Sequence, residues 1–97
     1  MKPVTIHREA EAELAESVAF YESRSAGLGL EFESAARAAV TRIQNAPELF
    51  PARKNGARRF VMDRFPFIIH YLDLHDTIWI VAFAHTSRKP DYWLKRL

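Results

Sequence analysis

Ile78-Trp79-Ile80-Val81-Ala82-Phe83-Ala84 is apolar at every position. A strand with one face in water alternates apolar and polar residues, whereas a strand covered on both faces is apolar throughout. The branched and aromatic side chains of this run favour a strand over a buried helix. We therefore expect a strand at Thr77–Ala84 in the centre of a sheet, with cover on both faces.

The residues before this run predict three further strands. From Arg58 onward the apolar residues recur with a period of two, which predicts strands at Arg58–Met62 and Pro66–Leu72. The turn at Leu74-His75-Asp76 then joins the strands at Pro66–Leu72 and Thr77–Ala84 into an antiparallel hairpin. A β-prone segment, Pro3–His7, predicts the first strand of the chain.

Between the first strand and the others, the apolar period becomes that of an α-helix. The period predicts one helix at residues 8–24, with Glu9, Glu13 and Glu16 on the side away from its apolar stripe, and a second at about residues 27–46. The short loop between them requires the two helices to lie side by side and antiparallel. Pro47 ends the second helix because proline cannot continue it.

The order of these elements predicts an α+β fold in one domain, residues 1–97. An N-terminal strand precedes an antiparallel helical hairpin, which packs on one face of a small, mainly antiparallel sheet. Pro90 permits a short C-terminal helix from Asp91 to Leu97, whose last turn carries cations where the helix dipole favours them.

Composition narrows the class of protein. There is no cysteine, so neither a disulfide framework nor a thiolate metal site can form. No apolar stretch approaches the ~20 residues of a membrane span, and no secretion signal opens the chain, so we expect a cytoplasmic protein that does not contact the membrane.

Charge is divided unevenly along the chain. Residues 8–50 hold eight glutamates against four arginines, whereas residues 51–97 hold nine lysines and arginines against four aspartates. The second half could meet an anionic partner, and two solvated faces of opposite sign would explain the division equally well.

Five short segments, in this order and at this chain length, resemble the RelE/ParE toxin family. They are Pro47-Glu48-Leu49-Phe50-Pro51, Arg58-Arg59-Phe60, Arg64-Phe65-Pro66-Phe67-Ile68-Ile69-His70-Tyr71, Ile80-Val81-Ala82-Phe83-Ala84-His85 and Arg88-Lys89-Pro90-Asp91-Tyr92-Trp93. The resemblance spans nearly the whole chain. It implies the toxin of a type II toxin–antitoxin system of the plasmid-stabilisation type, which arrests growth unless a cognate antitoxin neutralises it.

The two branches of the family have different targets. ParE toxins poison DNA gyrase by binding it, whereas RelE toxins cut messenger RNA on the ribosome without a metal ion. A third possibility is a binding module of the same fold that is not toxic. The resemblance implies no cofactor in any of these cases, and the histidines show no metal-ligand spacing.

The RelE reading requires cations that stabilise a phosphorane and groups that transfer protons. The candidate catalytic residues are Arg59, Arg64, His85, Arg88 and Tyr92. The candidate residues for target or partner binding are Arg53, Arg58, Lys89 and Trp93, because cations beside aromatic rings suit nucleic acid or an acidic protein. Each of these nine residues also has an ordinary structural explanation, such as a solvated arginine or an aromatic ring that fastens the C-terminal segment.

One departure from the RelE pattern favours the ParE branch. RelE toxins carry paired lysines shortly before the middle strands, where this chain has Arg53-Lys54 and a single lysine. The Phe65-Pro66-Phe67 turn and the Tyr92-Trp93 ending also look closer to ParE. We therefore expect gyrase rather than the ribosome as the target.

Overall fold

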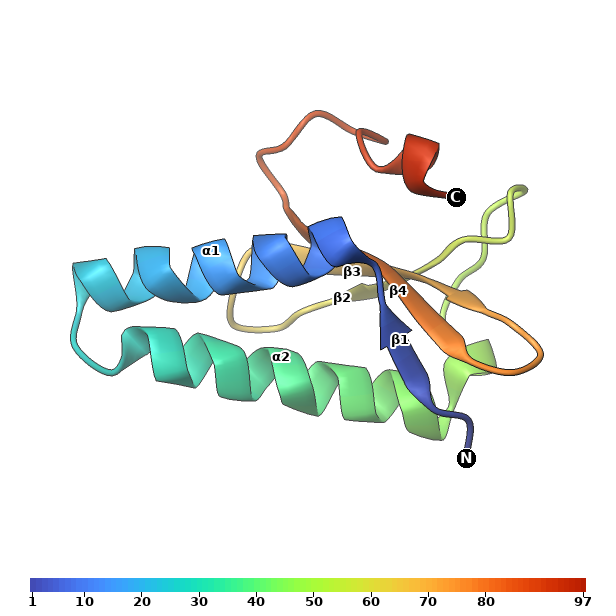
Figure 1. Ribbon diagram of the computed structural model, residues 1–97, viewed down its shortest axis with the longest axis horizontal. Helices are drawn as coiled ribbons and strands as arrows, with labels where there is room; N and C mark the ends of the chain where they lie inside the picture. The colour runs from blue at the N-terminus through green and yellow to red at the C-terminus, as the bar shows by residue number, and fades with distance from the viewer.

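The computed structural model describes residues 1–97 and contains one four-stranded sheet. The strand order is β1-β4-β3-β2, and β1 runs parallel to β4 while the other neighbours are antiparallel. The strands are β1 (Val4–Ile6), β2 (Arg58–Val61), β3 (Phe67–Asp73) and β4 (Ile78–His85). The apolar run therefore lies inside the sheet, between β1 and β3, as its sequence predicts (Figure 1).

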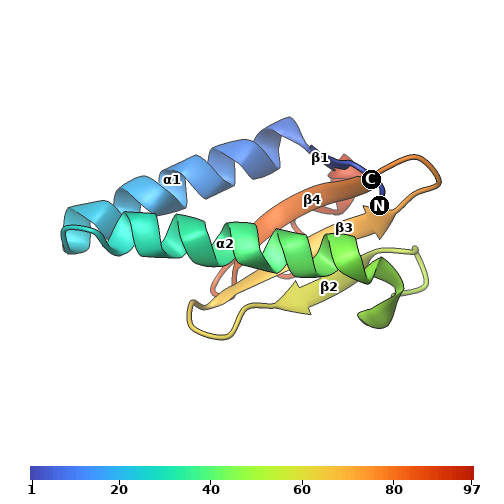
Figure 2. The same cartoon turned by 90° about the horizontal axis from the view of Figure 1, so that it is seen from below.

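Two antiparallel helices, α1 (Arg8–Arg24) and α2 (Leu28–Asn45), cover one face of the sheet (Figure 2). The helices approach each other closely at Gly29, where an added Cβ would lie 2.5 Å from the carbonyl oxygen of Val18. The Glu22 side chain accepts hydrogen bonds from the backbone N–H groups of Gly27 and Gly29. This carboxylate satisfies donors that the first turn of α2 leaves free.

The main core fills the space between the helices and the sheet. Phe32 and Ile43 from α2 are fully buried there with Ile69 and Ile80 from the sheet. The Tyr71 hydroxyl donates to the carbonyl of Pro47, 2.6 Å away. That bond ties the short 3-10 helix η1 (Pro47–Leu49) to the centre of the sheet.

A β-bulge at Val81 changes which side chains of β4 face the helices. Tyr71 pairs with Ile80 and His70 pairs with Ala82, so Val81 has no partner across the ladder. Ile80 before the bulge and Phe83 after it belong to the core under the helices, whereas Val81 and Ala82 pack on the opposite face. Both faces of β4 are thus covered.

The C-terminal segment corrects two predictions. The C-terminal helix is shorter than the predicted Asp91–Leu97: residues 90–93 form turns, and the 3-10 helix η2 (Leu94–Arg96) follows. Asp91 has φ of 64°, a left-handed conformation that an α-helix cannot contain. The second correction concerns Glu13, which is 9% exposed rather than solvated because the segment folds back over it.

No helix in the structure combines the length and the apolar character needed to cross a membrane.

Candidate functional site: a basic hollow on the sheet

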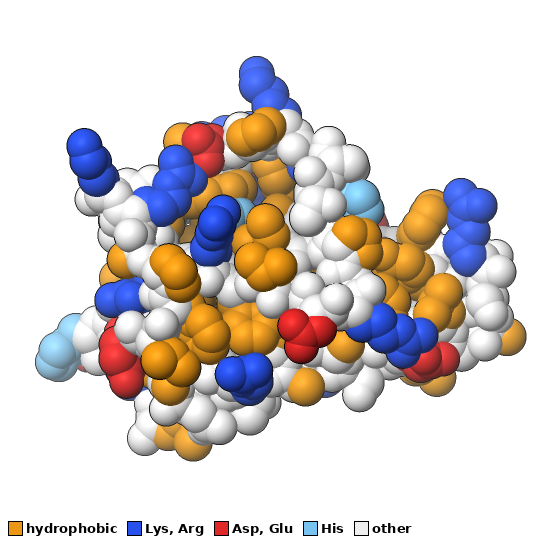
Figure 3. Space-filling model, turned by 180° about the vertical axis from the view of Figure 1, so that it is seen from behind, with side chains coloured by type: hydrophobic (Ala, Val, Ile, Leu, Met, Phe, Trp, Pro, Cys, Tyr) orange, Lys and Arg blue, Asp and Glu red, His pale blue; other side chains and the backbone are white.

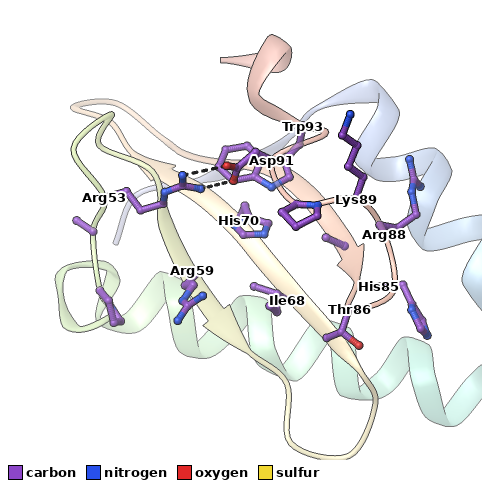
Figure 4. Close-up of a pocket in the computed structure, with 14 residues that line it drawn as sticks. Arg53, Arg59, Ile68, His70, His85, Thr86, Arg88, Lys89, Asp91 and Trp93 are labelled. Carbon is purple, nitrogen blue, oxygen red and sulfur yellow. Dashed lines mark hydrogen bonds and ion pairs between the residues drawn. The ribbon is translucent and has the colours of Figure 1, made fainter.

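The face of the sheet opposite the helices carries a hollow of about 480 Å³ (Figure 4). Its floor is formed by outward-facing residues of β3 and β4, among them Ile68, His70 and Ala84. Its sides come from the loop before β2, from β2 itself and from the segment after β4. On the face drawn in Figure 3, lysine and arginine side chains surround patches of hydrophobic surface.

Four cationic side chains line this basic hollow: Arg53, Arg59, Arg88 and Lys89. Asp91 is its one carboxylate and is already engaged, because both oxygens accept hydrogen bonds from Arg53, at 2.5 and 3.3 Å (Figure 4). The Arg53 hydrogen bond holds the pKa of Asp91 below its usual range. The hollow as a whole is therefore positively charged.

His70 is the most buried titratable side chain that lines the hollow. It is 8% exposed and stacks on Trp93, with ring centroids 4.2 Å apart and planes 25° from parallel. Its Nδ1 atom has no hydrogen-bond partner. Burial, together with the charges of Arg53 and Arg59, lowers the pKa of His70 to about 4, so the ring is neutral at pH 7.

The hollow brings together six of the nine residues that the sequence singled out: Arg53, Arg59, His85, Arg88, Lys89 and Trp93. Trp93 is 1% exposed, so its ring fastens the C-terminal segment to the sheet. The Nδ1 atom of His85 accepts a hydrogen bond from the backbone N–H of Ser87, 3.0 Å away.

The other three residues lie outside the hollow. Arg58 donates to the carbonyls of Glu48 and Phe50 and so braces η1 against β2. Arg64 pairs with Glu31 of α2, 2.6 Å away. Tyr92, the third, donates its hydroxyl to Glu13 on α1.

Glu13 is the centre of a buried polar cluster that sequence reasoning missed. Its carboxylate accepts two hydrogen bonds from the Arg96 guanidinium, each 3.0 Å long, and one from the backbone N–H of Phe83. Burial and the hydrogen bond to Glu13 raise the pKa of Tyr92. The only signal in the sequence is that Glu13 lies one turn from Ala10 and beside Leu14, at the edge of the apolar stripe.

Arg88 links this cluster to the hollow. Its guanidinium carbon lies 3.9 Å from the centre of the Tyr92 ring, and one nitrogen lies 4.0 Å from the Glu13 carboxylate. Arg59 and Lys89, by contrast, have no acidic partner. No three His, Asp or Glu side chains gather as the ligands of a metal ion would.

The helical hairpin on one face of a small, mainly antiparallel sheet is the fold that the sequence predicts, and the basic hollow lies on the other face. A solved structure described as the chromosomal ParDE TA system from P. aeruginosa has the same fold, with a TM-score of 0.76 and 20% identity over 90% of this chain and 98% of that one. The family model for the ParE toxin of the type II toxin–antitoxin system, parDE, matches residues 4–90, and the chain therefore belongs to the ParE toxin family. No curated protein matches the sequence.

Proposed function

We propose that this chain is a toxin that inhibits DNA gyrase by binding it, and that a cognate antitoxin neutralises it. Membership of the ParE family supports a toxin. The choice of gyrase over messenger RNA rests on one observation, which is that two of the five candidate catalytic residues, Arg64 and Tyr92, lie outside the hollow.

Two of the five candidate catalytic residues are engaged elsewhere. The Tyr92 hydroxyl donates to Glu13, and its raised pKa makes it a poor general base. Arg64 forms an ion pair with α2, outside the hollow. The hollow retains cations that bind an anion. Of the two imidazole rings that line it, His70 is buried with its Nδ1 atom covered, and Nδ1 of His85 already accepts a hydrogen bond from Ser87. A binding role without catalysis therefore fits these residues better than an endonuclease.

Two apolar grooves support the antitoxin as a partner. One, of about 430 Å³, runs between β1 and the helices and is lined by Val4, Ile6 and Val40 among others. The second lies between α2 and β2, beside Ala39, Phe60 and other residues. A segment that folds on binding can cover such extended surfaces. Arg58 donates to backbone carbonyls and Arg53 is paired with Asp91, so Lys89 is the candidate cation left free for acidic groups of the antitoxin.

The test is induction of the toxin alone in bacterial cells, with DNA breaks and messenger RNA cleavage followed in parallel. We expect double-strand breaks, an SOS response and intact messenger RNA, and we expect the purified chain to inhibit supercoiling by gyrase. Co-expression of the antitoxin should restore growth.

Other outcomes would favour the alternatives. Translation that stops while DNA stays intact would point to a ribosome-dependent endonuclease, and its cuts should then disappear in an Arg59/Arg64/Arg88 triple alanine variant. Unaffected growth at strong induction would point to a binding module that is not toxic.

A further inference from the structure

We propose that the basic hollow binds a backbone phosphate of DNA, so that the toxin contacts the DNA held by its target as well as the target protein. This inference rests on the proposed function and deepens it, because it assigns a ligand to the hollow. The argument starts from charge, continues with shape and ends with the choice among anions.

The hollow carries positive charge that the protein itself does not neutralise. Arg53 is paired with Asp91, and Arg88 lies over Tyr92 near Glu13. Arg59 from β2 and Lys89 from the C-terminal segment lack any acidic partner and lie on different sides of the same cavity (Figure 4). Cations from separate elements that face one space are suited to surround a compact anion.

The hollow is also a formed cavity rather than a flat basic surface. Its volume of about 480 Å³ is within the ~300–1,000 Å³ of ordinary ligand sites. Ile68 and Ala84 give it an apolar floor on which a sugar could rest. His70, more than nine-tenths buried, adds its ring to the lining of the cavity, while its Nδ1 atom is itself covered.

A phosphate fits these features better than the carboxylate of a peptide. One arginine fork satisfies a carboxylate, as Arg53 satisfies Asp91 here, whereas a phosphodiester presents oxygens in several directions. Contacts to phosphates do not distinguish one base from another. This agrees with the floor of the hollow, which offers few hydrogen-bonding groups to read a base. DNA rather than RNA follows from the proposed target.

The experiment measures binding of the purified chain to a fluorescent DNA duplex by anisotropy, over a range of salt concentrations. We expect binding that weakens with salt, because each bound phosphate releases counterions. R59Q or K89Q should each reduce the slope of log K against log salt by about one, and the double variant by about two. The control R24Q/K95Q also removes one arginine and one lysine, but from exposed positions outside the hollow, and should leave the slope unchanged.

Three results would overturn the inference. The first is equal DNA affinity for R59Q/K89Q and the control. The others are binding of RNA of the same sequence but not of DNA, and binding of an acidic antitoxin peptide but not of DNA. Gyrase assays separate this inference from the proposed function. If R59Q/K89Q loses DNA binding but inhibits supercoiling at wild-type potency, the phosphate site is not part of the mechanism. If the wild-type chain binds DNA through the hollow but does not inhibit gyrase, the proposed target is wrong and the phosphate site stands.

Discussion

His70 is a single side chain whose protonation makes the stability of the fold depend on pH. Its ring stacks on Trp93, and burial there disfavours a proton on the imidazole. The charges of Arg53 and Arg59 disfavour that proton as well. Glu13 and Asp91 act in the opposite direction but more weakly. The folded protein therefore keeps His70 neutral at pH values where an unfolded chain would protonate it.

This difference predicts a loss of stability in mild acid. The pKa of His70 is about 4 in the folded protein against 6.5 as the ordinary value, so protons bind the unfolded chain first as the pH falls. Stability should be complete above pH 6.5 and decline from there to pH 4, by roughly 2 kcal/mol after allowance for solvent in the hollow. Urea denaturation at a series of pH values measures the loss.

The matched variants are H70F and H75Q. Phenylalanine can still stack on Trp93 but cannot titrate, so H70F should remove this part of the pH dependence. His75 is exposed in the turn between β3 and β4, and H75Q should keep the wild-type profile. An H70F profile that declines as steeply as the wild type between pH 6.5 and 4 would contradict the assignment.

At the scale of the element, the sequence predicted the helices and strands to within a residue or two but not the irregular features. The apolar run of β4 indicates burial on both faces. Because apolar and polar residues do not alternate in it, the run does not show which side chains face the helices, and the bulge at Val81 cannot be predicted from it. The C-terminal helix was predicted from Pro90 and the cations after it. The left-handed turn at Asp91 depends on contacts with Arg53 and the sheet, which no local pattern records.

The candidate site was predictable to a similar degree. Cations beside aromatic residues indicated the residues around the hollow, because their types suit an anion wherever the fold places them. The partners Glu13 and Arg96 were missed because only the fold brings together residues so distant in sequence.

The contact between α1 and α2 gives a prediction for G29A. An added Cβ would meet the Val18 carbonyl oxygen at 2.5 Å and the Glu22 Cβ at 2.9 Å, and a backbone atom cannot swing away. The helices must separate locally, at a cost of about 1–3 kcal/mol. Thermal unfolding followed by circular dichroism should show a lower Tm for G29A. S34A, at an exposed position of the same helix, should change stability by less than about 0.5 kcal/mol. A G29A variant as stable as S34A would show that the helices do not meet as described.

At the scale of the whole molecule, the Glu13–Arg96 ion pair joins the first helix to the last turn. Arg96 also donates to the carbonyl of Val81, at the bulge of β4. One guanidinium thus connects α1, β4 and the C-terminal segment beneath the surface. The hollow depends on this connection, because its Arg88–Trp93 side belongs to the segment that Arg96 holds in place.

Breaking this ion pair should destabilise the protein more than removing it. R96M leaves the Glu13 carboxylate buried without its main partner. E13L in turn leaves the Arg96 guanidinium buried without a carboxylate to pair with. Each change should cost about 3–5 kcal/mol, whereas the double variant should lose less than either single variant. Urea denaturation of the four proteins in a double-mutant cycle measures the difference. Additive losses would show that the two charges do not interact.

The pairing of β1 with β4 affects the rate at which the protein can fold. About three quarters of the chain lies between Val4 and its partner Ile78, and joining them restricts all of the intervening residues. Contacts between residues so far apart form more slowly than contacts between neighbours, such as those within the helical hairpin. We therefore expect this closure of the sheet, rather than formation of the helices, to limit the rate of folding.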